Sequence, residues 1–294
     1  MITIQNYRLV DSLEEAWTLN QKRSNRILGG MHWTKMSRNP VNTVIDLSRL
    51  GLDQIEESDE AFRIGCMVSL RQLETHPGLA AYTEGAMREA LRHIVGVQFR
   101  NTATLGGSIY GRYGFSDVLT IFLAMDTSVE LYKHGLVPLN EYAQGGFERD
   151  VIAHIIVKKS PAHFRYLSVR NSQTDFPVLT CTAGIYTSTG SMTSPENDPA
   201  SSVLLQAYCQ PGYAPASAVR LCIGARPGRA ILLEDANHIL KAPLTPDAIS
   251  CFADFAAAHV TTQSNLRGSA QYRSHLVRVL TRRALTQIGG DSPC

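Results

Sequence analysis

The segment Gln98–Asp117, QFRNTATLGGSIYGRYGFSD, constrains this chain most, because it holds four glycines and ends on an acid. Glycine lets the backbone adopt positive φ and lets a ligand approach without meeting a Cβ. Successive backbone N–H groups in such turns form a concavity that binds anions. We call Gln98–Asp117 the second loop. It predicts a cradle for a phosphate-bearing cofactor, with Gly106 and Gly107 open to phosphate groups. The alternative is a glycine-rich surface loop that joins two elements.

The second loop also carries side chains that fit a sugar–phosphate ligand. Thr104, Ser108 and Ser116 have hydroxyl groups that donate hydrogen bonds, and Thr104 is expected to donate to a phosphate or ribityl oxygen. Asp117 is expected to accept from a sugar hydroxyl. The alternatives are local: Thr104 caps its own loop, and either Ser116 or Asp117 caps the helix that follows.

A second glycine pair, Gly29-Gly30, follows a short apolar run in Arg26–Lys35 (RILGGMHWTK). A strand that runs into two glycines ends where side chains would otherwise block a ligand. We call Leu28–Trp33 the first loop, and we expect the two loops to close on one extended ligand such as a dinucleotide. The sequence contains neither G-x-G-x-x-G nor G-x-x-x-x-G-K-[ST], so neither a Rossmann site nor a P-loop is indicated.

These loops and four further segments resemble the FAD-binding subunit of the molybdenum hydroxylases, the family of xanthine dehydrogenase and carbon monoxide dehydrogenase. The first loop takes the place of the family's A-G-G-T-D-L, and the second loop follows its Q-I-R-N-x-G-T-I-G-G-N-I and later acid. The further segments resemble V-I-D-L, I-G-A-x-x-T-L-x-x-L, F-x-K-x-x-x-R and R-G-S-A-x-Y-R. They are, in that order, Thr43–Leu50 (TVIDLSRL), Arg63–Leu73 (RIGCMVSLRQL), Phe164–Arg170 (FRYLSVR) and Asn265–Arg273 (NLRGSAQYR).

The resemblance spans nearly the whole chain and implies that the chain binds FAD. The residues that it implies as cofactor-binding are Leu28, Gly29, Gly30, Met31, His32, Trp33, Thr104, Gly106, Gly107, Ser108, Ser116, Asp117, Ile152 and Tyr166. It implies no catalytic side chain and no metal ligand in this chain, because a flavin carries its own redox chemistry. In agreement, the sequence has no H-E-x-x-H or G-x-S-x-G motif.

Four of these residues depart from the family pattern. Met31 replaces a threonine and cannot donate a hydrogen bond to a phosphate, so backbone N–H groups are expected to do so. His32 stands where aspartate is frequent and would bind a phosphate better when protonated. Ser108 replaces asparagine but remains a donor and an acceptor, and Tyr166 replaces a lysine. Trp33 is expected to pack on the cofactor or in the core beside the loop.

The resemblance also implies the fold class. We expect an α+β protein with a two-lobed FAD-binding domain of the PCMH/vanillyl-alcohol-oxidase type at 1–160, its lobes at about 1–55 and 56–160. A C-terminal α+β domain of the CO-dehydrogenase flavoprotein type, with a small antiparallel sheet, is expected at 161–294. Hydrophobic periodicity predicts the individual elements. Helices are expected at Leu13–Asn20 (with a Ser12/Glu15 capping box), Leu79–Val95, Val118–Met125, Thr245–His259 and Ala270–Leu285. Short buried strands are expected at Arg26–Leu28 and Val44–Leu47. Further strands are expected at Phe62–Val68, Val129–Tyr132, Val151–Val157, Val178–Thr187, Val203–Cys209 and Val219–Gly224, and a hairpin loop at Ser191–Ser202.

Composition limits the partners and the compartment. The net charge of +2 implies no nucleic-acid partner, and the basic run Arg273–Arg283 is expected to be a solvated helix face or a subunit contact. The six cysteines include no C-x-x-C pair, which predicts buried thiols in a reducing cytosol rather than a local zinc or iron–sulfur site. The longest apolar run, Val118–Met125, is too short for a membrane span, and residues 1–12 lack a signal-peptide core. We expect a soluble cytoplasmic protein.

The implied function is electron transfer within a multi-subunit molybdenum hydroxylase. Substrate would be oxidised at molybdopterin in a large partner subunit. Electrons would then pass from [2Fe–2S] clusters in a small partner subunit through FAD to NAD or another acceptor. One alternative is an assembly or scaffold subunit with weakened or lost flavin binding. Another is a stand-alone flavin oxidase, against which the C-terminal third argues because it shows no catalytic constellation.

Overall fold

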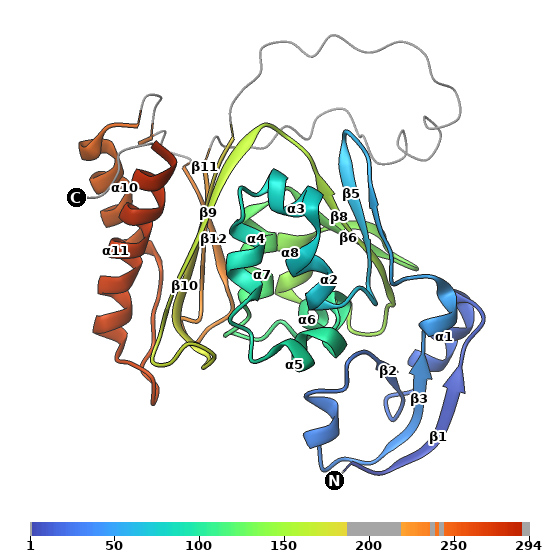
Figure 1. Ribbon diagram of the computed structural model, residues 1–294. Helices are drawn as coiled ribbons and strands as arrows, with labels where there is room; N and C mark the ends of the chain where they lie inside the picture. The colour runs from blue at the N-terminus through green and yellow to red at the C-terminus, as the bar shows by residue number, and fades with distance from the viewer. Residues whose placement is uncertain (1, 187–218, 236–238, 241–243, 290–294) are drawn as a thin grey trace, which may run out of the picture.

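The computed structural model describes residues 2–186, 219–235, 239–240 and 244–289. Within them three sheets are joined by helices, as Figure 1 shows. The N-terminal lobe is a parallel sheet of order β1-β3-β2, built from Ile4–Leu9, Val41–Asp46 and Arg26–Leu28. Strand β2 is partly exposed, so the expectation of a buried strand there was wrong.

The helix α1 (Leu13–Asn20) begins as expected at Ser12, whose side chain accepts from the Glu15 N–H at 3.1 Å. The other half of the capping box is displaced by one residue, because the Glu15 carboxylate accepts from the N–H of Asp11 at 3.1 Å. Two short 3₁₀ turns complete this lobe, at Thr34–Met36 directly after the first loop and at Ser48–Leu50.

The second lobe has a five-stranded antiparallel sheet of order β4-β5-β8-β6-β7. These strands are Ile55–Glu57, Ala61–Gly65, Ile152–Lys158, Thr127–Leu131 and Gly135–Pro138. Its helices are α2 (Leu70–Thr75), α3 (Pro77–Tyr82), α4 (Ala86–Leu91), α5 (Val97–Thr102), α6 (Leu105–Gly111), α7 (Asp117–Ala124) and α8 (Leu139–Gln144).

The expectation of one helix over Leu79–Val95 was wrong, because the chain turns sharply between α3 and α4. Glu84 and Gly85 both have positive φ, 50° and 83°, which no α-helix accommodates. The Glu84 carboxylate is held by two side chains of the next sheet, which fixes the turn. The second loop is likewise mostly helical, since it contains α5, α6 and the start of α7.

The C-terminal sheet has the antiparallel order β12-β11-β10-β9. Its strands are Ile231–Glu234, Val219–Gly224, Pro177–Tyr186 and Ala162–Arg170. Helix α11 (Ala270–Gly289) packs on one face with α10 (Pro246–His259) against it, while α4 and α7 pack on the other (Figure 1). Because helices cover both faces of this sheet, nearly all of β10 is buried. The packing of α4 and α7 on the sheet also joins it to the second lobe.

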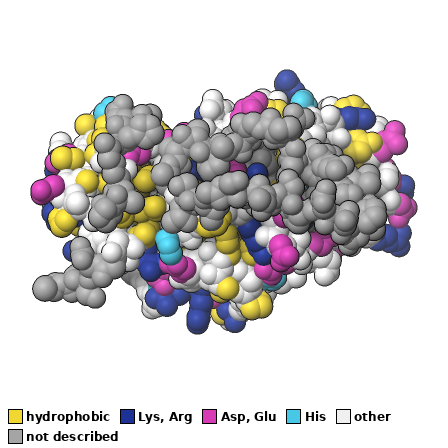
Figure 2. Space-filling model, turned by 90° about the horizontal axis from the view of Figure 1, so that it is seen from above, with side chains coloured by type: hydrophobic (Ala, Val, Ile, Leu, Met, Phe, Trp, Pro, Cys, Tyr) yellow, Lys and Arg dark blue, Asp and Glu magenta, His cyan; other side chains and the backbone are white. Residues whose placement is uncertain are grey.

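The architecture confirms the expected α+β class with small antiparallel sheets. The expected strand Val203–Cys209 and hairpin loop Ser191–Ser202 lie outside the described residues. In the described part of the chain, no helix is long and apolar enough to cross a membrane, and no cluster of three or more His, Cys, Asp or Glu is placed to hold a metal ion. On the visible part of the face in Figure 2, Lys and Arg lie among Asp and Glu and form no single basic patch.

Two expectations about side chains needed correction. Cys66, Cys181 and Cys222 are buried thiols as expected, but Cys251 is exposed on α10. Arg273, the first residue of the basic run, is fully buried, with 0% of its surface exposed.

Candidate cofactor-binding site

The first and second loops lie in direct contact. A Cβ at Gly30 would stand 2.2 Å from the carbonyl oxygen of Thr102, and one at Gly29 would stand 2.9 Å from Thr104 Oγ1. The Gly30 contact is with backbone and excludes any side chain there, whereas the Gly29 contact is with a side-chain oxygen that would have to shift. Gly30 is therefore required for the two loops to meet, and Gly29 lets them pack closely.

His32 joins the same two loops. Its Nε2 lies 2.8 Å from Thr102 Oγ1, and its ring centroid lies 3.8 Å from that of Phe99. Burial and the nearby Lys35 lower the pKa of His32 below 6.5. The ring is thus mostly neutral at pH 7, and it contributes a hydrogen bond between the loops rather than the positive charge considered from the sequence.

The first loop presents a row of free backbone donors. Among the residues that the structure describes, no protein group accepts from the N–H groups of residues 29–33. Met31, in the middle of this row, has a φ of 57°, in the left-handed region. Consecutive N–H groups around a left-handed residue form an anion-binding concavity. The row therefore needs no side-chain donor at Met31 to offer hydrogen bonds to an anion.

The N–H groups of the second loop are already used within the protein. Those of Leu105 and Gly106 donate to the carbonyls of Val68 and Cys66, both at 2.8 Å. That of Gly107 donates to Thr104 Oγ1 at 3.2 Å, so Thr104 is the N-cap of α6. The alternative noted for Thr104, that it caps its own segment, is therefore what the structure has.

The two glycines of α6 differ in their surroundings. A Cβ at Gly106 would stand 2.7 Å from Cys66 Cβ, so this position is needed for packing. A Cβ at Gly107 would meet only Thr104 Oγ1 within 4 Å, in a tight contact at 3.0 Å with a side chain rather than with backbone. Ser108 donates its hydroxyl to the Thr104 carbonyl at 3.0 Å. Of these residues, Gly107 offers a ligand the clearest approach.

Asp117 is engaged by protein donors rather than open to a sugar hydroxyl. Its Oδ1 accepts from the hydroxyl of Tyr166 and from the guanidinium of Arg170. All three side chains are buried. Burial raises the pKa of Asp117 to about 6, although Arg170 and Tyr166 oppose the rise. Asp117 therefore links the start of α7 to strand β9.

Trp33 packs on aromatic side chains from two other segments. Its ring centroid lies 5.3 Å from Tyr113, 5.4 Å from Phe115 and 6.1 Å from Phe176. The first two belong to the second loop, and Phe176 precedes β10. The indole is still 39% exposed, so one side of it remains available to a ligand.

The other implied residues have local roles in the structure. Ser116 is the N-cap of α7 and accepts from the N–H of Leu119 at 3.0 Å. Leu28 ends β2 opposite Asp46 of β3. Ile152 begins β8 and is buried.

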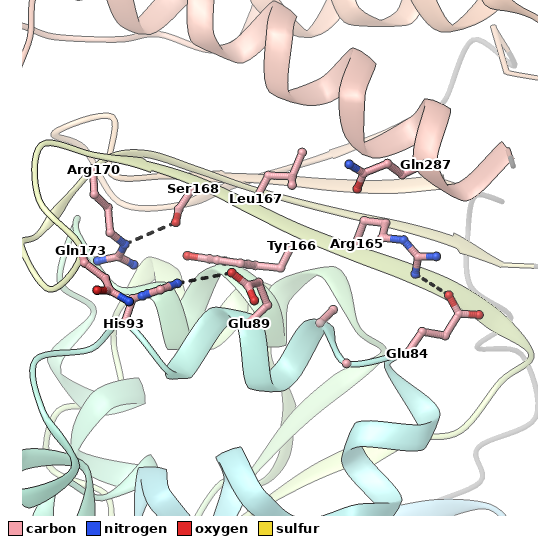
Figure 3. A pocket seen from close by; sticks show the side chains of 12 residues that line it. Glu84, Glu89, His93, Arg165, Tyr166, Leu167, Ser168, Arg170, Gln173 and Gln287 are labelled. Atoms are coloured by element: carbon pink, nitrogen blue, oxygen red, sulfur yellow. Dashed lines mark hydrogen bonds and ion pairs between the residues drawn. The ribbon is translucent and has the colours of Figure 1, made fainter. Parts of the chain in front are cut away.

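A cavity of about 520 Å³ lies between α4, β9 and the end of α11 (Figure 3). Tyr166 and Arg170 line it, whereas no residue of either loop does. Neither this cavity nor the contact of Arg170 with Asp117 was predicted from the sequence. The signal available was the F-x-K-x-x-x-R segment, since residues 166 and 170 lie on the same face of a strand.

Comparison with known proteins identifies relatives across the chain. Residues 3–159 match the family model of the FAD binding domain in molybdopterin dehydrogenase, and residues 206–288 match that of the CO dehydrogenase flavoprotein C-terminal domain. The nicotine 6-hydroxylase medium subunit of Paenarthrobacter nicotinovorans is 23% identical over 258 residues, covering 84% of this chain and 82% of the relative. The 6-hydroxypseudooxynicotine dehydrogenase complex subunit alpha of the same organism is 26% identical over 302 residues, covering 96% and 93%.

A solved structure shares the fold. A chain of carbon monoxide dehydrogenase from Hydrogenophaga pseudoflava superposes with a TM-score of 0.78 at 22% identity, covering 96% of each chain. At that identity the likeness shows the fold alone, and it confirms the expected fold class.

Proposed function

We infer the function of this chain from its family. The chain belongs to the family defined by the FAD binding domain in molybdopterin dehydrogenase, and it is an oxidoreductase subunit. We propose that it binds FAD and transfers electrons within a multi-subunit molybdenum hydroxylase. The observation that carries the proposal is the row of free N–H groups at residues 29–33, held against the second loop by Gly29 and Gly30.

The proposal assigns a role to each part of the site. The backbone of residues 29–33 would hold the diphosphate, since charged acceptors form strong hydrogen bonds with N–H groups. Gly107 would leave room beside it, and the Thr104 hydroxyl, which accepts from the Gly107 N–H, would have its own proton to donate. Trp33 would pack on the cofactor through its exposed side.

When bound, FAD would supply the redox chemistry, taking electrons from [2Fe–2S] clusters in a small partner subunit and passing them to NAD or another acceptor. A large molybdopterin-binding partner would oxidise the substrate. The residues of this chain would bind and orient the cofactor.

Purification of the chain with and without its partners tests this proposal. The purified protein should be yellow, and denaturation should release FAD. A large molybdenum-containing chain and a small iron–sulfur chain should co-purify with it from the native source. A folded, colourless protein that takes up no flavin on incubation with FAD would refute the proposal.

One observation favours a second candidate, an assembly subunit with weakened flavin binding. The α6 N–H groups and the Asp117 carboxylate are both occupied by protein partners, so these groups are not free to contact FAD. Titration separates the two candidates. Binding of FAD at micromolar or lower concentration supports the electron-transfer subunit, and binding only at millimolar concentration supports the assembly subunit.

A further inference from the structure

We propose that Tyr166 and Arg170 are positioning residues for flavin binding, which hold the second loop in place from the C-terminal sheet by fixing Asp117. This inference rests on the proposed function, because it assigns to these residues an effect on FAD. Neither residue belongs to the two loops, and both lie on β9.

The first observation is the shared carboxylate. Asp117 closes the second loop and is the first residue of α7. Tyr166 and Arg170 reach it from one face of β9 and donate to the same oxygen, Oδ1. Figure 3 shows both side chains projecting from β9 toward the side of α4. A buried carboxylate with two such donors has one favourable position, so β9 determines where α7 begins.

The second observation is that Arg170 is itself fixed by its neighbours. Its Nη1 donates to the Asp175 carbonyl at 2.6 Å, and its Nε donates to Ser168 Oγ at 3.3 Å. Only Nη2 is directed to Asp117. All three guanidinium nitrogens of Arg170 therefore donate hydrogen bonds, each to a different partner. The single ammonium group of a lysine can reproduce only some of these bonds.

The third observation is an aromatic contact that joins the same segments independently. Phe176, next to Asp175, lies 4.5 Å from Phe115, measured between ring centroids, and it also packs on Trp33. Arg267 holds this segment, because it pairs with the Asp175 carboxylate at 3.0 Å and its guanidinium lies 5.0 Å over the Phe176 ring. Both loops and the β9–β10 turn thus meet at one point.

The chain offers a matched control on the same strand. Arg165 of β9 pairs with Glu84 at 2.5 Å, so this ion pair also joins the second lobe to the C-terminal sheet. Figure 3 shows it at the other end of the cavity from Arg170. Glu84 lies in the turn between α3 and α4, outside both loops. Loss of this pair removes a contact between lobe and sheet but leaves Asp117 untouched.

The experiment measures FAD affinity by fluorescence quenching, and folding by circular dichroism, for the wild type and four variants. Arg170→Met should weaken FAD binding by about tenfold or more, since a hydrogen bond to a charged group is lost. Arg170→Lys should restore part of the affinity. Tyr166→Phe should weaken it by about threefold to tenfold without a change in packing. Arg165→Met should stay within about twofold of the wild type, as expected of a partly exposed ion pair.

Each outcome decides between the proposals. A wild type that binds no FAD refutes the proposed function and this inference with it. A wild type that binds FAD, with Arg170→Met and Tyr166→Phe both within twofold of it, overturns this inference alone. Equal losses in Arg165→Met and Arg170→Met overturn it as well, because they show a general effect of sheet packing. If Arg170→Met does not fold, Tyr166→Phe and Arg170→Lys decide in the same way.

Discussion

Gly30 of the first loop lies against the backbone of the second loop, so closely that a Cβ at Gly30 would stand 2.2 Å from the carbonyl oxygen of Thr102. Because the obstacle is backbone rather than a side-chain end, it cannot rotate away. This contact makes the two loops one unit. Several effects of mutation can be derived from it and from its neighbours.

Gly30→Ala should force the loops apart. We expect a loss of about 1–3 kcal/mol in the free energy of unfolding, typical of overpacking, together with weaker FAD binding. Denaturant unfolding and FAD titration measure the two effects. Gly289→Ala is the control, because its Cβ would meet nothing closer than 3.7 Å. Unchanged stability in Gly30→Ala would contradict the contact.

The adjacent glycines of α6 should respond differently to substitution. Gly106→Ala places its Cβ against Cys66, so it should lower the melting temperature. Gly107→Val meets only the Thr104 side chain, at 3.0 Å, so it should cost less stability than Gly106→Ala but abolish flavin binding. Thermal unfolding and flavin content of the purified variants test this. Full flavin content in Gly107→Val would rule out a ligand at this position.

His32 should make stability depend on pH. Burial, with Lys35 nearby, lowers the pKa of His32 in the folded state below 6.5, its ordinary value. The unfolded chain therefore binds more protons in this window, and stability rises with pH. The contribution of His32 is complete above pH 6.5 and is lost as the pH falls through the folded-state pKa. Urea unfolding from pH 5 to 8 should show a wild-type advantage over His32→Gln that shrinks toward acid. A difference in the free energy of unfolding between the wild type and His32→Gln that does not change with pH would contradict the lowered pKa of His32.

Arg273→Met should strongly destabilise the protein. Arg273 donates to the carbonyls of Val178 and Gln263 at 2.9 and 2.7 Å, and it is fully buried. Its removal leaves buried carbonyl acceptors unpaired, at a cost of roughly 1–3 kcal/mol each. Arg278→Met, at a half-exposed position of the same helix, should cost within about 0.5 kcal/mol. Similar values for both variants in denaturant unfolding would show that Arg273 has no special role.

From the two glycine pairs, the sequence predicted that the first and second loops lie together, because glycine pairs are a local signal. The family resemblance implied the fold class. The sequence pattern missed α5 and α6, since helices of six and seven residues give little periodicity and glycine disfavours helix interiors. It also merged α3 with α4, although Gly85 was the available signal of a break.

Contacts between residues far apart in the chain could not be predicted from the sequence. Asp117 and Arg170 are 53 positions apart, and only the packing of α7 on the C-terminal sheet brings them together. The N–H groups of the first loop were expected to donate to a phosphate, and they are free in the structure. The first N–H groups of α6 instead donate to the carbonyls of Val68 and Cys66, which the sequence did not indicate. No local pattern shows which carbonyl a helix N-terminus meets.

The most direct test of the central claim, that the backbone of residues 29–33 binds the diphosphate of FAD, is a titration of the flavin-free protein with FAD and with riboflavin. FAD should bind at micromolar or lower concentration. Riboflavin, which lacks the diphosphate and the adenosine, should bind at least about a hundredfold more weakly, because at least two charge-assisted hydrogen bonds are missing. Equal affinity for both flavins, or no binding of FAD, would contradict the claim.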